Sequence, residues 1–384
     1  MIFRFQFIKF YGMIVAVISV IHEGVKLMQY YGTLGPACGQ VEILKKMFEA
    51  GMTGVRMNMS HGNLDENGHW LELLFEAAKL CGVERPQVLI DLRGPELRLG
   101  KVDAEFSVAE GELVTLGDGG LAVPQMLLDY AEIGDHVLLD DGKLELVVET
   151  VDGAADETVP NQEVPAEGIA VAGPEMQVEA TKVASVRART LRGGVVKSGK
   201  SLAIVGKELP MPTLTESDIK NIGLAPKYGV TGVMQPFVRG KHDLLTVREA
   251  LRAAGAEDSE IFAKIENQQG VAALDELLPY CDHVVIARGD LGNAMPLWEL
   301  PRVQKEISAK CRAAEKPFMV VTQMLDSMHE RAVPTRAEVL DIYNAVLDGA
   351  ASVMLTGETA AGKYPVEAME YLVKTGEEAR KNRK

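Results

Sequence analysis

The sequence HVVIARGDLGNAMPLWELPRVQKEISAKCRAAEKPFMVVTQ, residues 283–323, places two strand patterns on either side of a helical one. The runs HVVIA and FMVV are almost continuously apolar, which is typical of strands buried on both faces of a parallel sheet. Residues 302–314 carry apolar side chains at spacings of three and four, which indicates an amphipathic helix. The stretch is therefore predicted to form a βαβ unit.

The same alternation extends along most of the chain. Strand patterns occur at 29–33, 54–59, 87–92, 232–237, 260–266, 283–289, 318–323 and 351–356. Helical patterns follow most of them, for example at 41–50, 244–254 and 335–347. Eight such units close naturally into a (β/α)8 TIM barrel, in which the chemistry collects at the C-terminal ends of the strands.

The alternation fails between 100 and about 192. There VLLDDGKLELVV (137–148) predicts a hairpin, and SVRART (185–190) alternates with the period of a strand. We therefore expect an α/β fold with a small β-barrel lid domain inserted after the third strand. The expected domains are an N-terminal extension at 1–27, a catalytic barrel at 28–99 and 193–384, and the lid at 100–192.

Composition excludes several classes of protein. The 384 residues carry a formal net charge of −15, which argues against a nucleic-acid partner. The four cysteines show no CxxC spacing, which suits a reducing, cytoplasmic compartment. Segment 1–27 resembles a signal peptide, but its apolar run at 11–21 is too short to span a bilayer, so we expect no membrane association and a start near Met28.

Polar side chains share one face at the ends of two strands. Arg56, Asn58 and Ser60 are spaced by two in RMNMS, so they point to one side. Lys264 and Glu266 do the same in AKIEN, within an otherwise apolar strand. A polar edge strand and a structural ion pair are the plain alternatives, but buried charges are costly unless they are paired or bind a metal.

A metal site is expected beside these residues. Asp290 follows Gly289 at the end of the next strand, so Glu266 and Asp290 would supply two carboxylates from neighbouring strands. Carboxylates together with substrate and water oxygens suit Mg²⁺. Arg56 and Lys264 would then neutralise a phosphoryl group in transfer. Thr322 and Glu358 are expected to complete the mouth of the barrel.

The segment GVVKSGKS (194–201) formally matches a phosphate-binding loop. That motif requires a preceding strand and a helix that begins at its lysine. Here SLAIVGKELP follows, with β-branched residues, a glycine and a proline. We therefore interpret the match as a strand returning from the lid to the barrel.

Seven motifs, in order, resemble those of pyruvate kinase over residues 28 to 384. They are MTGVRMNMSHG, DLRGPELRLG, FAKIENQQGV, VVIARGDLG, VTQMLDSM, PTRAEVLDIYNAVLDG and MLTGETAAGKYPVEA. The resemblance implies a glycolytic kinase that uses Mg²⁺ (or Mn²⁺) and K⁺ to move a phosphoryl group from phosphoenolpyruvate to ADP, giving pyruvate and ATP. It also implies a homo-oligomer, such as a dimer through the barrel.

The resemblance assigns roles to matching residues. It implies that Arg56 binds the substrate phosphate, that Lys264 stabilises the transferring group, and that Thr322 lies where the enolate is protonated. Amides near Gly289 and Asp290 would receive the substrate carboxylate. The implied ligand sets are Glu266 and Asp290 for Mg²⁺, Asn58, Ser60, Asp91 and the Leu92 carbonyl for K⁺, and Thr33, Pro36, Asn58, His61 and Arg98 for the nucleotide.

Some features depart from the family pattern. Leu92 and Arg93 stand where Thr and Lys are usual, and Pro236 stands where a Ser is common. The sequence ends just after the expected eighth helix, so we expect a form without the family's C-terminal regulatory domain. Two alternatives remain open: another metal-dependent barrel enzyme acting on phosphoenolpyruvate or pyruvate, and a non-catalytic relative that senses metabolites.

Overall fold

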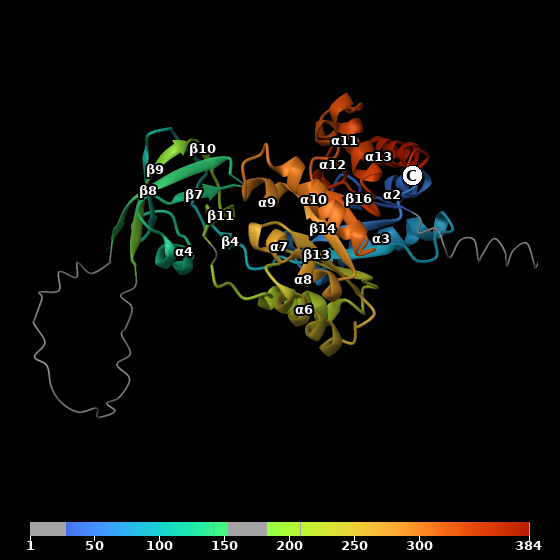
Figure 1. Cartoon of the computed structure of the whole chain (residues 1–384), viewed down its shortest axis with the longest axis horizontal. Coiled ribbons are helices and arrows are strands. Elements are labelled where there is room, and N and C mark those ends of the chain that lie inside the picture. The colour runs from blue at the N-terminus through green and yellow to red at the C-terminus, as the bar shows by residue number, and fades with distance from the viewer. Residues whose placement is uncertain (1–27, 141, 153–182, 208, 384) are drawn as a thin grey trace, which may run out of the picture. The chain divides into compact units, whose positions relative to one another are not determined.

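Figure 1 shows the computed structural model, which describes residues 28–140, 142–152, 183–207 and 209–383. The expectations for segment 1–27 lie outside the described residues. The chain divides into two compact units. Of the described residues, those up to Pro95 and from Pro212 onward form one unit, and those between Glu96 and Met211 form the other.

The first unit is a closed barrel of eight parallel strands. The strands are β1 (Gln29–Thr33), β2 (Gly54–Asn58), β3 (Gln87–Asp91), β12 (Gly232–Gln235), β13 (Glu260–Ile265), β14 (His283–Ala287), β15 (Phe318–Val321) and β16 (Ser352–Met354). Each pairs with the next along this order, and β16 closes onto β1. The predicted TIM barrel and its eight strands are confirmed.

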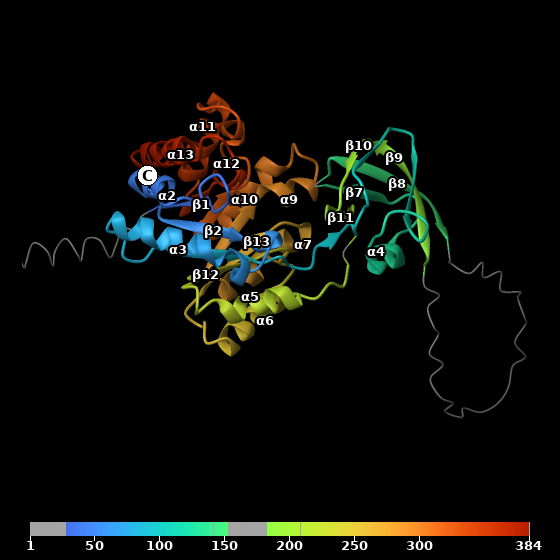
Figure 2. The same cartoon turned by 180° about the vertical axis from the view of Figure 1, so that it is seen from behind.

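Helices surround the barrel strands, as the two opposite views in Figures 1 and 2 show. They are α2 (Val41–Glu49), α3 (Leu64–Leu80), α5 (Glu216–Leu224), α6 (Lys241–Ala253), α7 (Gln268–Ala272), α8 (Leu274–Leu277), α9 (Arg288–Asn293), α10 (Leu300–Ala313), α11 (Arg336–Leu347), α12 (Gly357–Ala360) and α13 (Pro365–Arg380), with 3-10 turns at Met59–His61, Leu278–Tyr280 and Asp326–His329. Within the described part of the chain, no helix is long and apolar enough to cross a membrane.

Side chains fill the inside of the barrel. Tyr31, Leu89, Met234, Phe262 and other fully buried residues from alternate strand positions form one apolar cluster there. A larger core packs between the strands and the surrounding helices. Because the interior is packed, a ligand can be bound only at the ends of the strands.

The second unit is an antiparallel β domain inserted after β3. Its six-stranded sheet has the order β4 (Leu97–Arg98), β11 (Ser201–Ile204), β7 (His136–Leu139), β8 (Leu144–Asp152), β9 (Ser185–Arg192) and β6 (Leu113–Gly117). Strands β5 (Phe106–Val108) and β10 (Gly194–Val196) form a separate pair, and α4 (Gln125–Tyr130) is the one helix found among its described residues.

The inserted unit is larger than the predicted stretch 100–192. Strand β4 pairs with β11, and β11 pairs with β7, so residues on both sides of that stretch belong to its sheet. The predicted hairpin forms between β7 and β8. Strand β11 begins directly after Lys200, where a phosphate loop would begin a helix, so GVVKSGKS forms no phosphate loop. The segment contains β10, a turn and the first residue of β11, all within the inserted unit, so the predicted single strand returning to the barrel is not what forms.

An ion pair fastens the loops at the N-terminal ends of β13 and β14. The Asp282 carboxylate accepts hydrogen bonds from the Ile261 amide and from Arg248 Nη2, each at 2.7 Å. Arg248 Nη1 also donates to the Ser259 carbonyl oxygen at 3.2 Å. Burial alone would raise the pKa of Asp282, but the Ile261 amide and Arg248 outweigh it and hold that pKa below its usual value.

Asp282→Asn should therefore remove a pH-dependent part of the stability. A lowered native pKa means that the unfolded chain binds the proton more readily, so the stabilisation is complete above the ordinary carboxyl pKa of ~3.9 and is lost as the pH falls below it. The thermal midpoints of wild type and variant should differ most near neutral pH and converge in acid. A difference that stays constant with pH would contradict this account.

Candidate active site

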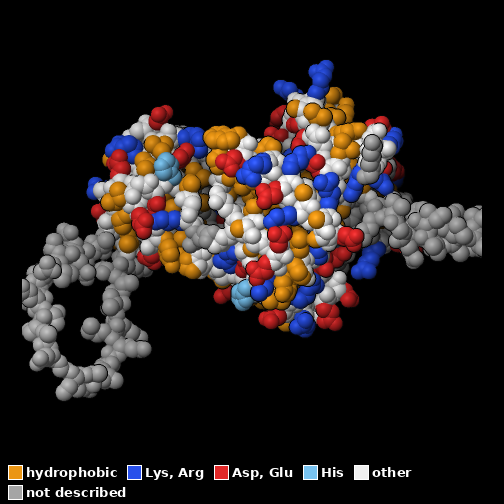
Figure 3. Space-filling view, viewed as in Figure 1, with side chains coloured by type: hydrophobic (Ala, Val, Ile, Leu, Met, Phe, Trp, Pro, Cys, Tyr) orange, Lys and Arg blue, Asp and Glu red, His pale blue; other side chains and the backbone are white. Residues whose placement is uncertain are grey.

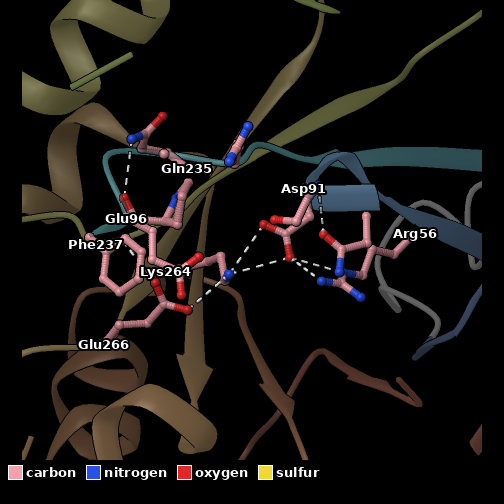
Figure 4. Close-up of polar contacts among 12 residues, drawn as sticks. Arg56, Asp91, Glu96, Gln235, Phe237, Lys264 and Glu266 are labelled. Atoms are coloured by element: carbon pink, nitrogen blue, oxygen red, sulfur yellow. Dashed lines mark hydrogen bonds and ion pairs between the residues drawn. The ribbon is translucent and has the colours of Figure 1, made fainter. Parts of the chain in front are cut away.

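A chain of buried charges crosses the C-terminal ends of β2, β3 and β13 (Figure 4). Asp91 Oδ2 accepts hydrogen bonds from Arg56 Nε at 2.8 Å and Nη2 at 2.6 Å. Lys264 Nζ donates to Asp91 Oδ1 at 3.1 Å and lies 2.8 Å from Glu266 Oε1. The side chains of Arg56 and Lys264 are each 13% exposed, so both cations keep limited contact with solvent.

The charges in this chain stabilise one another. Burial alone would raise the pKa of Asp91, but Lys264 and Arg56 outweigh that effect and hold the pKa below its usual value. Burial would likewise lower the pKa of Lys264, but Asp91 and Glu266 raise it well above the ordinary lysine value. Lys264 is therefore charged throughout the physiological pH range, as a group that neutralises phosphate must be.

Both oxygens of the Glu266 carboxylate are held in place by neighbouring groups. Its Oε2 accepts a hydrogen bond from the Phe237 amide at 2.8 Å. Its Oε1 is buried and forms the 2.8 Å ion pair with Lys264 Nζ. Asp290 adds the smallest of the named contributions to the raised pKa of Lys264.

This donor set fits a divalent ion that shares its ligands with a substrate. Among the described residues, no group of three or more His, Cys, Asp and Glu side chains could enclose a metal. Mg²⁺ typically takes one or two protein carboxylates and completes its octahedral shell with water and substrate oxygens. Glu266 and Asp290 match that pattern.

Oxygen atoms also gather around Asp91. Asn58 pairs with Asp91 across β2 and β3, and its Oδ1 accepts a hydrogen bond from the Ser60 amide at 3.1 Å. The loop after Asp91 is fixed by the fully buried Asp218, which accepts hydrogen bonds from the Arg93 and Gly94 amides. The position of the Leu92 carbonyl is thus set by its neighbours in the chain.

Thr322 lies beside the first turn of α9. Its φ of +80° is unusual for a β-branched residue and carries a strain of ~1–3 kcal/mol. A Cβ added at Gly289 would lie 3.2 Å from Thr322 Cγ2, a tight contact that would require Thr322 to shift by a few tenths of an ångström. Thr322 therefore packs directly against Gly289, next to Asp290.

A model of the family "Pyruvate kinase, barrel domain" matches residues 25–183 and 169–369. The chain belongs to the pyruvate kinase barrel family. It is 38% identical over 347 residues to the pyruvate kinase of Geobacillus stearothermophilus, and the aligned region covers 88% of this chain and 54% of that protein. The chain is 37% identical over 352 residues to the pyruvate kinase of Aeropyrum pernix, and that alignment covers 91% of this chain and 70% of the relative. The chain thus spans about half the length of the first of these relatives and somewhat more of the second.

The structure brings together most of the residues that the sequence pointed to in this pyruvate kinase barrel. Arg56, Asp91, Lys264 and Glu266 are in direct contact, and Gly289 contacts Thr322. The Lys264–Glu266 ion pair, which is the plain alternative for the AKIEN pattern, does form, and it is part of the same chain of charges.

The residues expected to bind nucleotide are more scattered. Thr33 is buried at the end of β1, where its hydroxyl donates to the Leu355 carbonyl oxygen and accepts from Arg56 Nη1 at 3.4 Å. Pro36 is exposed in the turn that follows. His61 is the last residue of a 3-10 turn, and its side chain is not among the parts that the structure describes. Arg98 belongs to the inserted unit, where it pairs with Glu96 at 2.5 Å.

Two further residues acquire roles that the motifs did not reveal. Glu358 was expected at the mouth of the barrel, but its buried carboxylate accepts hydrogen bonds from the Leu325 and Thr356 amides, so it holds the loops after β15 and β16. Arg288 Nη2 donates to the Thr322 carbonyl oxygen at 2.6 Å. The sequence signal that could have pointed to Arg288 is its place between the buried strand HVVIA and the expected site residues Gly289 and Asp290.

Replacing Asp91 by Asn should destabilise the protein strongly. The substitution leaves the buried cations Arg56 and Lys264 with Glu266 as their one remaining carboxylate. Breaking a buried ion pair lowers the free energy of unfolding by about 3–5 kcal/mol. Asp282→Asn is the matched control, because it alters an Arg–Asp pair whose carboxylate is 40% exposed and which should therefore contribute about 1 kcal/mol or less. Chemical denaturation of both variants at neutral pH compares them; an equal or smaller loss for Asp91→Asn would contradict the described network.

Proposed function

We propose that this chain catalyses Mg²⁺-dependent transfer of a phosphoryl group from phosphoenolpyruvate to ADP, giving pyruvate and ATP, the pyruvate kinase step of glycolysis. The observation that carries the proposal is the buried chain of Arg56, Asp91, Lys264 and Glu266 at the strand ends of a pyruvate kinase barrel. It presents two fixed cations and a metal-binding carboxylate on one side of the barrel, which is what phosphoryl transfer requires.

The residues divide the work of the reaction. Arg56 holds the substrate phosphate, and Lys264 faces the charge that spreads over the phosphoryl oxygens as the group leaves. Both side chains are already oriented by Asp91, so no reorganisation is needed when that charge develops. A Mg²⁺ or Mn²⁺ ion held by Glu266 and Asp290 would neutralise further charge on phosphoryl and substrate oxygens.

The substrate carboxylate is proposed to bind at the start of α9. Amides near Gly289 and Asp290 lie there, and the missing side chain at Gly289 lets a ligand approach the backbone. Thr322 packs against Gly289, so a substrate bound there would present its methylene carbon near the Thr322 hydroxyl. That placement suits protonation of the enolate left after transfer.

Further partners are proposed on less direct grounds. Asn58, Ser60, Asp91 and the Leu92 carbonyl offer oxygens to K⁺, and Thr33, Pro36, Asn58, His61 and Arg98 are the proposed nucleotide contacts. The face shown in Figure 3 mixes acidic and basic side chains, and no nucleic-acid partner is proposed, on the ground of the net charge of −15. A cytoplasmic location is proposed from the cysteine usage.

A homo-oligomer formed through the barrel unit is also proposed. The barrel exposes several large apolar side chains, namely those of Leu297, Trp298, Val333 and Leu340, of which Trp298 is 83% exposed. Exposed apolar surface of this kind favours a covering partner, and a second copy is the simplest one. Sedimentation over a range of concentrations tests for self-association, and a monomer at every concentration would contradict it.

The alternative functions make different demands on the site. A lyase acting on phosphoenolpyruvate would use the metal carboxylates but would not transfer phosphate to ADP. A non-catalytic relative would be expected to have lost Lys264 or a metal carboxylate, and this chain has both Lys264 and Glu266, paired at 2.8 Å. The described geometry therefore favours the kinase.

Lys264→Met should nearly abolish phosphoryl transfer, because the lost cation acts mainly on charge in the transition state. Removal of one such group costs about 3 kcal/mol, or roughly a hundredfold in rate. Lys316→Met is the matched control, since Lys316 is also partly buried but donates to the Cys281 carbonyl oxygen at the opposite end of the barrel. Initial rates of pyruvate formation compare the three proteins. A Lys264→Met rate within about threefold of wild type would count against the assignment.

Activity should also depend on K⁺. A monovalent ion at Asn58, Ser60 and Asp91 would add positive charge where the phosphoryl group passes. Replacing K⁺ by tetramethylammonium at constant ionic strength should therefore reduce the rate steeply. Ser60→Ala removes one proposed ligand and should raise the K⁺ concentration needed for half-maximal rate; a flat dependence on K⁺ in the wild type would show that these oxygens form no such site.

A further inference from the structure

Thr322 adopts a backbone conformation that its own side chain disfavours. Its φ is +80°, and the next residue, Gln323, also has a positive φ of +53°. Two successive non-glycine residues in this region persist only where surrounding contacts determine them. The contacts that hold Thr322 are therefore of functional interest, because its side chain packs on Gly289.

Arg288 supplies the contacts to the Thr322 backbone. Its Nε and Nη2 both donate to the Thr322 carbonyl oxygen, at 3.1 Å and 2.6 Å. Its Nη1 donates to Asp341 Oδ2 on α11 at 2.6 Å, and Nη2 also approaches Met324 Sδ at 3.0 Å. The Arg288 side chain is only 12% exposed, so these charge-assisted bonds form largely out of water and fix the guanidinium in one orientation.

The same residue begins the segment on the other side of the substrate position. Arg288 is the first residue of α9, and Gly289 and Asp290 follow it directly. Its backbone thus leads into the proposed carboxylate and metal site, while its side chain holds Thr322, which directly follows the neighbouring strand β15. One residue therefore sets the spacing between these two parts of the site.

We propose that Arg288, anchored by Asp341, is a positioning residue for protonation of the enolate. This inference rests on the proposed function. In that step the electron pair of the C2–C3 double bond forms a new C3–H bond and the C2 oxygen becomes the ketone. The Thr322 hydroxyl gives its proton to C3 and regains one from water, and the hydroxide left behind is neutralised by a proton from bulk solvent, so Thr322 ends the step protonated. Arg288 touches no reacting atom and acts through the placement of Thr322.

A purely structural role for Arg288 would have a different consequence. If the Arg288–Asp341 pair only tied α11 to the barrel, its loss would weaken the fold and slow every step alike. If it acts through Thr322, its loss should slow proton transfer most, and should matter little once the Thr322 hydroxyl is gone. A double-mutant cycle separates these possibilities.

The experiment measures two rates for each protein. One is turnover of phosphoenolpyruvate and ADP with Mg²⁺ and K⁺. The other is exchange of the pyruvate methyl protons with D₂O, followed by proton NMR with Mg²⁺, K⁺ and inorganic phosphate, which reports the protonation step in reverse. The proteins are wild type, Arg288→Met, Thr322→Ala and the double variant. Arg248→Met is the matched control, because Arg248 also joins an aspartate to a backbone carbonyl, but at the opposite end of the barrel.

Arg288→Met should slow methyl-proton exchange by roughly tenfold or more, since general acid–base groups of this kind contribute large factors. Added to Thr322→Ala, it should cost no more than about twofold. Arg248→Met should leave the ratio of the two rates unchanged. If Arg288→Met slows exchange by the same factor with and without the Thr322 hydroxyl, or leaves exchange unchanged, the inference is wrong.

A second variant guards against misfolding. Asp341→Asn keeps the shape of the anchor but weakens its hold on Arg288, so it should show the same selective loss of exchange in a milder form, and the same dependence on Thr322. The circular dichroism spectrum and thermal midpoint of each variant establish that it is folded. Failure of the proposed function can be told apart from failure of the Arg288 proposal. If the kinase assignment is wrong, the wild-type protein forms no ATP, and the positioning role of Arg288 is then wrong as well.

Discussion

The structure depends on a buried carboxylate that is shared by two cations. Asp91 contacts both Arg56 and Lys264, and Lys264 also contacts Glu266. Buried charges are tolerated only when they are paired, so these residues must lie together or the fold loses stability. The closed barrel meets this demand, because β2 and β3 are neighbours and a single strand, β12, separates β3 from β13.

The same arrangement prepares the site for chemistry. Asp91 orients both Arg56 and Lys264 before any substrate arrives, and together with Glu266 it keeps Lys264 charged. A site that is already polarised needs little rearrangement as charge develops on a phosphoryl group. Stability and function thus draw on one set of contacts, and a change at Asp91 should affect both.

The sequence predicts the barrel well and the contacts less well. Strands such as HVVIA are apolar over consecutive residues, which is a local signal. The predicted strands ran two residues too far where Phe237 and Thr322 take positive φ values, because that conformation has no sequence pattern outside glycine. The predicted limits of the inserted unit were too narrow, because β4 and β11 pair across about a hundred residues of chain. The hydrogen bonds from Arg288 to Thr322 were not predicted, because the acceptor is a backbone carbonyl oxygen, which has no sequence signal.

The most direct measurement follows the phosphorus atom itself. Wild-type protein with phosphoenolpyruvate, ADP, Mg²⁺ and K⁺ is observed by phosphorus NMR until the substrate is consumed. The account predicts that the phosphoenolpyruvate signal is replaced by the γ-phosphate signal of ATP in equal amount. Consumption with release of inorganic phosphate, or no consumption at all, would contradict the assignment of Arg56, Lys264 and Glu266 to phosphoryl transfer.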